Sequence, residues 1–129
     1  MLVETSAIVA IMLEEPDAPA LAERLDAVDK PVTTIVNAFE AALSLGRVLE
    51  DRELAARLVP GFLTSAGVEM IGIDADLYDD VAQAYAQYGR GTGHPAALNF
   101  GDCFSYAAAK RLGVPLLYKG DDFSRTDLR

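Results

Sequence analysis

Four widely separated points in the chain carry acidic residues in positions where metal-assisted chemistry is possible. Glu4 ends a short apolar segment and is followed at once by the apolar run "TSAIVAIML". Glu40 lies within the largely apolar segment "VNAFEAALSL", and Asp102 lies in "NFGDCF". Asp121 and Asp122 follow the apolar "VPLLY" after two residues. Carboxylates without an accompanying cluster of His or Cys favour hard cations such as Mg²⁺ or Mn²⁺.

Each of these acids has a simple structural explanation when it is considered alone. Asp102 is placed to complement the N-terminus of a helix, where negative charge is favourable. Asp121 and Asp122 follow a glycine, and Gly-Asp-Asp is a common turn sequence. Glu40 is less easily explained, because an isolated acid on a largely apolar helix is unusual. A functional interpretation therefore depends on whether the fold brings the acids together.

The hydrophobic pattern predicts strands that alternate with helices. Expected strands are 2–4, 31–34, 68–73 and 114–118, and expected helices are 6–13, 18–28, 35–50, 51–65, a segment ending at 88, and 100–112. Asp51 begins the fourth helix, Asp74 or Asp76 caps the fifth, and Gly113 closes the last one. This alternation predicts an α/β fold with a mostly parallel sheet covered on both faces.

The helix expected at 35–50 carries seven apolar residues that we interpret as its buried face. They are Ile35, Val36, Phe39, Leu43, Leu45, Val48 and Leu49.

In such a fold, ligands bind beyond the carboxyl ends of the strands. Glu4 lies at the end of the first strand, and Asp121 and Asp122 lie just beyond the end of the last. Glu40 and Asp102 lie near the starts of helices that begin at the same edge. Carboxylates gathered there repel one another unless some are protonated or a cation is bound. A divalent cation held in this way is suited to the hydrolysis of a phosphodiester bond.

Composition limits the class of protein further. The 129 residues suit a single domain, 1–129, with an ordinary apolar content of 51%. The net charge of −9 argues against a protein that coats nucleic acid by electrostatic attraction. No apolar run is long enough to span a bilayer, nothing resembles a signal peptide, and Cys103 is the only cysteine. We therefore expect a cytoplasmic protein that does not associate with membranes.

Three segments resemble the PIN-domain ribonucleases, and in particular the VapC-type toxins of bacterial type II toxin–antitoxin pairs. They are "LVETSAIVAIMLEEP", "VNAFEAALSL" and "HPAALNFGDCFSYAAAKRLGVPLLYKGDDFSRTDL", in the family's order and over essentially the whole chain. The resemblance implies a PIN-like three-layer α/β/α fold with a central sheet of four to five strands. It also implies Mg²⁺-dependent (or Mn²⁺-dependent) cleavage of RNA, a cognate VapB-like antitoxin and a homodimer.

The family's catalytic acids fall on Glu4, Glu40, Asp102 and the pair at 121–122. Among these, Glu4, Asp102 and Asp122 are the expected metal ligands. Neighbours in extended backbone point in opposite directions, so we do not expect both acids of this pair to serve equally. We prefer Asp122, because related sequences often keep the acid next to the Phe, and Asp121 is the alternative. Five basic residues are expected to supply positive charge near the cleft, namely Arg47, Lys110, Arg111, Lys119 and Arg125.

At one position the chain departs from the family, which usually has Asp where this chain has Glu4. The carboxylate is retained, but its stem is longer by one bond, about 1.5 Å. Mg²⁺ requires nearly octahedral ligands at about 2.0–2.1 Å, so Glu4 must fold back, coordinate differently or fail as a ligand. The alternative function is a PIN-like binding module whose nuclease activity is reduced or lost because of Glu4.

Overall fold

A sheet of four short parallel strands divides the molecule in the computed structural model, which describes residues 1–128. The strand order is β3-β2-β1-β4, with β1 Leu2–Val3, β2 Val32–Thr34, β3 Glu69–Ile71 and β4 Leu116–Leu117. Every neighbouring pair is parallel. The predicted parallel sheet is confirmed, but each strand is shorter than the apolar segment that indicated it.

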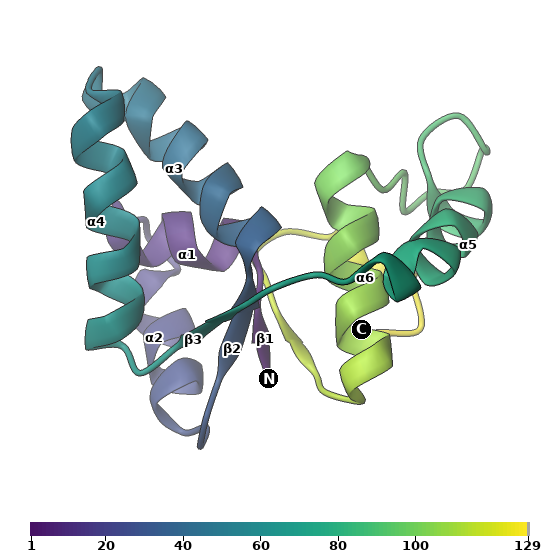
Figure 1. Cartoon of the computed structure of the whole chain (residues 1–129), viewed down its shortest axis with the longest axis horizontal. Helices are drawn as coiled ribbons and strands as arrows, with labels where there is room; N and C mark the ends of the chain where they lie inside the picture. The colour runs from purple at the N-terminus through teal and green to yellow at the C-terminus, as the bar shows by residue number, and fades with distance from the viewer. Residues whose placement is uncertain (129) are drawn as a thin grey trace.

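Helices cover both faces of this sheet (Figure 1). They are α1 Thr5–Met12, α2 Ala18–Asp26, α3 Ile35–Leu49, α4 Arg52–Ser65, α5 Tyr78–Tyr88 and α6 Phe100–Leu112, with 3-10 turns η1 Ala75–Leu77 and η2 Phe123–Arg125. Figure 1 shows α1 to α4 on one side of the strands and α5 and α6 on the other. The predicted three-layer α/β/α arrangement is therefore confirmed.

Two apolar cores, one on each face, show how the strands alternate. Val3 and Leu117 pack into the core shared with α1 to α4. Leu2 and Leu116 pack into the core shared with α5 and α6. Because successive side chains of a strand point to opposite faces, the two buried residues of β1 and the two of β4 are enough to anchor both layers.

Local capping agrees with the predicted helix ends in most places. The Asp51 side chain accepts a hydrogen bond from the Leu54 N–H at 3.0 Å and begins α4. Gly113 ends α6 with a φ of 67°, a backbone conformation that glycine adopts without strain. Asp74 differs from the prediction, because it precedes η1 and its side chain makes no cap hydrogen bond.

The predicted buried face of α3 is wrong. Ile35, Phe39 and Val48 are 53%, 63% and 61% exposed. Of the seven predicted residues only Leu45 is buried, and the other buried residues of the helix are Asn37, Ala38, Ala41 and Gly46. These mostly small residues allow α3 to pack closely against its neighbours, whereas apolar spacing alone does not reveal which side of a helix is covered.

None of the helices in residues 1–128 combines the length and the apolar character needed to cross a bilayer.

Candidate active site

Glu4 connects the end of β1 to the start of α1. It is the N-cap residue of α1, and its Oε2 accepts hydrogen bonds from the Ser6 hydroxyl and, at 2.7 Å, from the Ser6 N–H. The Ser6 hydroxyl accepts a further hydrogen bond at 2.8 Å from the backbone N–H of Lys119, just after β4. Glu4 is 5% exposed. Its longer stem is thus accommodated by folding back onto the first turn of its own helix.

Glu40 is brought to the same place by α3, which begins immediately after β2. Its Oε1 accepts a hydrogen bond from the Thr5 hydroxyl at 3.1 Å. Thr5 is the residue that follows Glu4, so this contact links the acid on α3 to the end of β1.

The buried side-chain amide of Asn37 supports this arrangement through hydrogen bonds with three hydroxyl groups. Its Nδ2 donates hydrogen bonds to the hydroxyls of Thr5, at 3.1 Å, and Ser105, at 2.7 Å. Its Oδ1 accepts from the Thr34 hydroxyl at 2.7 Å. Asn37 is fully buried and lies three residues before Glu40. Its role was not predicted from the sequence, and the available signal was a polar residue one turn before Glu40 in the largely apolar first half of the helix.

Asp102 serves as a helix cap and also lines the cleft. Its Oδ2 accepts a hydrogen bond from the Asn99 N–H at 3.1 Å, while its own N–H donates to Asn99 Oδ1 at 2.9 Å. This reciprocal capping box stabilises the start of α6. The same carboxylate lines the cleft, so its structural role at the start of α6 leaves it accessible for a functional one.

One cleft of about 440 Å³ is lined by all four predicted acids. Its charged lining residues are Glu4, Glu15, Glu40, Arg47, Asp102, Lys119 and Asp122. Asp121 does not line this cleft. The preference for Asp122 agrees with this placement. The expectation of extended backbone at this pair is wrong, because Asp122 has helical dihedral angles and precedes η2.

Burial raises the pKa of three acids in this cleft. Burial raises the pKa of Glu4 to about 7, although hydrogen bonds from Ser6 lower it. Burial also raises the pKa of Asp102 to about 6, and the negative charges of Asp122 and Glu40 contribute to the rise. The pKa of Glu40 is raised by burial as well. Additional positive charge in the cleft is therefore needed before all the acids ionise readily at neutral pH.

Positive charge near the cleft comes from fewer side chains than predicted. Arg47 and Lys119 line it, and Lys119 Nζ lies 3.1 Å from Glu15 Oε1 and 3.2 Å from Asp17 Oδ1. Arg90 was not predicted, although its charge lowers the pKa of the Asp102 carboxyl.

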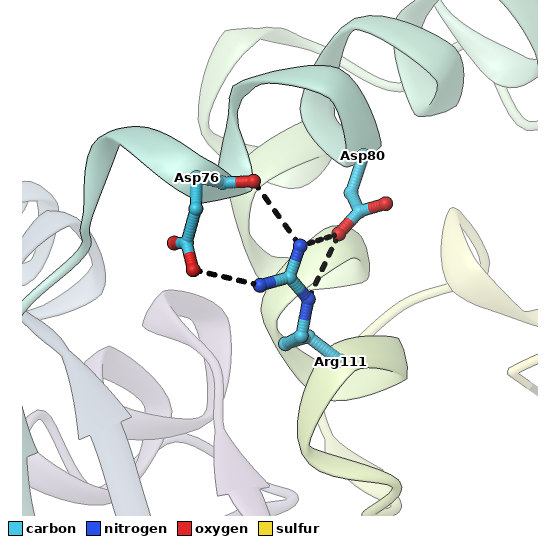
Figure 2. Close-up of polar contacts among 3 residues, drawn as sticks. All are labelled: Asp76, Asp80 and Arg111. Carbon is cyan, nitrogen blue, oxygen red and sulfur yellow. Dashed lines mark hydrogen bonds and ion pairs between the residues drawn. The ribbon is translucent and has the colours of Figure 1, made fainter.

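Three of the predicted basic residues do not line the cleft. Lys110 and Arg111 lie at the opposite end of α6. Figure 2 shows Arg111 between Asp76 and Asp80, with its Nη1 3.2 Å from Asp76 Oδ2 and its Nε 3.0 Å from Asp80 Oδ2. Lys110 pairs with Asp127, and Arg125 also lies outside the residues that line the cleft. For Lys110 and Arg111 the prediction failed because a helix of 13 residues separates its two ends by about 20 Å.

The carboxylate oxygens that line the cleft are the kind of ligand that binds a hard divalent cation. The expected ligands are carboxylates, and two of them, Glu4 and Asp102, are buried. A divalent cation would compensate their negative charge. Within residues 1–128, no three acidic, His or Cys side chains converge closely enough to hold an ion in their present positions. Side-chain rotation is therefore required before one ion is shared among them.

Comparison with known proteins gives the family. Residues 1–128 match the PIN domain family. The chain is 45% identical to Ribonuclease VapC42 of Mycobacterium tuberculosis over 129 residues, covering 100% of this chain and 97% of that protein. It is 43% identical to a VapC ribonuclease of Rhizobium meliloti, covering 98% of this chain and 97% of the relative.

A solved structure gives independent support for the fold. The crystal structure of Mycobacterium tuberculosis VapC20, described as a Sarcin-Ricin loop cleaving toxin, matches with a TM-score of 0.77 and 20% identity. The match covers 99% of this chain and 95% of that one. Together with the family match and relatives at more than 40% identity, these findings show that the chain belongs to the PIN-domain family and is a ribonuclease of its VapC group.

Proposed function

We propose that the chain cleaves RNA in the cleft lined by Glu4, Glu40, Asp102 and Asp122, with Mg²⁺ or Mn²⁺ as the cofactor. The observation that carries this proposal is the convergence of four carboxylates from separate parts of the chain on one cleft. Within residues 1–128, none of them forms an ion pair. We further infer that residues 1–129 act as a single cytoplasmic domain.

The acidic residues have two different proposed roles in hydrolysis. Glu4, Asp102 and Asp122 are the proposed ligands of the cation, which when bound polarises the scissile phosphate and stabilises the leaving oxygen. Glu40 is held by Thr5 through Oε1. We assign to its other oxygen, Oε2, the acceptance of a proton from the attacking water.

Arg47 and Lys119 are the proposed contacts to the RNA backbone. A chain with a net charge of −9 repels RNA overall, so attraction has to be local. Both side chains line the cleft, and Glu15 and Asp17 hold Lys119 there. Neutralising either cation should therefore weaken RNA binding and reduce its dependence on salt concentration.

A VapB-like antitoxin is the proposed protein partner. An arginine supplied by the partner would meet the unpaired carboxylates of the cleft through charge-assisted hydrogen bonds. Co-expression with an adjacent small reading frame should yield a stable complex that does not cleave RNA. If no adjacent frame exists and no protein co-purifies, the proposal of an antitoxin is wrong.

We also propose a homodimer in which the exposed apolar side chains of α3, including Phe39 and Val48, are covered. Phe39 and Val48 are each more than 60% exposed in the single chain. Light scattering of the purified protein decides this, and a monomer at all concentrations contradicts it.

The decisive experiment incubates the purified chain with total RNA in Mg²⁺, in Mn²⁺ and in a chelator. The cut sites are then mapped. Metal-dependent cleavage that is lost in Asp102→Asn supports the proposal, since that variant removes one carboxylate charge and keeps the side chain's size. RNA or antitoxin binding without metal-dependent cleavage in the parent favours the binding module. Cleavage that persists in the chelator contradicts the proposed cofactor.

A further inference from the structure

Gly101 occupies an unusual position in the first turn of α6, against the carboxylate of Glu40. A Cβ atom built at Gly101 would lie 2.2 Å from Glu40 Oε2, 2.4 Å from Oε1 and 2.5 Å from Cδ. Non-bonded carbon and oxygen atoms do not approach this closely. The absence of a side chain at Gly101 is therefore what makes room for the Glu40 carboxylate.

The backbone gives no other reason for glycine at this point. Gly101 is the second residue of α6, and it is not among the residues with positive φ. Glycine is less favourable than alanine within a helix, because it loses more conformational freedom on folding. The helix would thus accept alanine here if Glu40 did not occupy the space.

The two helices at this point are fixed relative to one another. The Ser105 hydroxyl donates a hydrogen bond to the Gly101 carbonyl at 3.3 Å, and Asn37 Nδ2 donates to that hydroxyl at 2.7 Å. Both Ser105 and Asn37 are fully buried, and Asn37 lies one turn before Glu40 on α3. An added methyl group at Gly101 would consequently displace the end of the Glu40 side chain rather than the helices.

We propose that Gly101 is a positioning residue, whose missing side chain determines where the Glu40 carboxylate lies in the cleft. Its effect on RNA cleavage rests on the proposed function, in which Glu40 takes part. Its effect on the Glu40 side chain does not rest on that function. Substitution with alanine should leave the fold intact and move the carboxylate away from its place beside Thr5.

The first test is a double-mutant cycle of urea unfolding without metal, using Gly101→Ala, Glu40→Ala and the double variant. In the Glu40→Ala background the clash is gone, so Gly101→Ala should raise the urea midpoint. In the parent background, Gly101→Ala should raise the urea midpoint much less, or should lower the midpoint. The matched control is Gly61→Ala in α4, where an added Cβ meets nothing within 4 Å, and this change should raise the midpoint in both backgrounds.

The cycle gives a clear result even when one variant is unstable. Equal changes from Gly101→Ala in the two backgrounds would overturn the proposal. Failure of both Gly101→Ala and the double variant to fold would also overturn it, because the added methyl would then clash with something other than Glu40. Failure in the parent background alone, with rescue by Glu40→Ala, would support it.

The second test measures RNA cleavage. Gly101→Ala should lower kcat by at least about tenfold with little change in KM, as expected when a catalytic group is misplaced by about 1 Å. Adding Gly101→Ala to Glu40→Gln should cause no further loss, and Gly61→Ala should cleave at the parental rate. A parental rate for Gly101→Ala beside a slow Glu40→Gln overturns the proposal. A parental rate for Glu40→Gln instead removes Glu40 from the proposed function, and the unfolding cycle then decides the role of Gly101.

Discussion

Acidic residues lie at both ends of α6, but in opposite circumstances. At its start, Asp102 is 8% exposed, and within residues 1–128 it has no ion-pair partner. At its end, Arg111 holds Asp76 and Asp80 in an exposed cluster that connects α6 to η1 and α5 (Figure 2). The acids at the start resist ionisation, whereas those at the end face a permanent positive charge.

The difference distinguishes acids in a structural ion-pair cluster from the acids of the proposed active site. Exposed ion pairs contribute little to stability, and they also cost little. Buried carboxylates without a cation destabilise the folded state when they ionise, and a ligand that binds only the folded state offsets that cost. The start of α6 is therefore the end where a cation should have its effect.

Neutralising one acid at each end of α6 should have the most unequal consequences for activity. We expect Asp102→Asn to lower RNA cleavage by about 10² to 10³-fold, because several kcal/mol of charge stabilisation are lost. Its capping acceptor is retained, so the protein should stay folded. Asp80→Asn, the matched control, should cleave at the parental rate. Initial rates at equal metal concentration measure both, and similar losses in the two variants would contradict the comparison.

The stability of the metal-free protein should fall as pH rises towards neutrality. The pKa of Glu4 rises from 4.5 to about 7 on folding and that of Asp102 from 3.8 to about 6, so between these values the folded state binds more protons than the unfolded state. The free energy of unfolding therefore decreases from about pH 4 to pH 7, by on the order of 3 kcal/mol for Glu4.

Urea unfolding at several pH values in a chelator tests this expectation. Glu4→Gln should make the pH dependence shallower, and Mg²⁺ or Mn²⁺ should stabilise the parent more at pH 7.5 than at pH 5. A parent protein that gains stability between pH 5 and 7 would contradict the assigned shifts.

Glu4→Asp should raise RNA cleavage by about tenfold. The shorter stem restores the ligand position that is usual in the family, and aspartate is also a better N-cap residue than glutamate. Glu4→Gln should abolish cleavage, since it keeps the length and removes the charge. Rates for the three proteins decide between a compromised ligand and a cleft adapted to Glu4. If Glu4→Gln cleaves like the parent, Glu4 is not a ligand.

The smallest effect is expected at the exposed end of α6. Arg111→Gln removes the ion pairs to Asp76 and Asp80 but leaves the apolar packing of α5 on α6 intact. We expect the Tm to fall by no more than about 3 °C, without any change in cleavage. Thermal unfolding at low and high salt measures this, and the difference between parent and variant should shrink at high salt. A loss of activity would show that the two ends are coupled.

The sequence by itself determined the order of elements, most helix boundaries and the edge of the sheet at which Glu4, Asp102 and Asp122 gather. These features follow from local causes, since strand–helix alternation implies parallel strands and parallel strands end at one edge. The Asp51 cap and the Gly113 terminus were predicted for the same reason, because a few neighbouring residues satisfy or end a helix.

Only the tertiary structure decided which side chains meet. It turned the small residues of α3 inward and left Phe39 exposed, it placed Asn37 among three hydroxyl groups, and it put Glu40 against Gly101. It also separated Arg111 from the cleft by the length of α6. Periodicity in a sequence defines the faces of a helix, but the face that is buried and the neighbour that it meets depend on packing between elements distant in the chain.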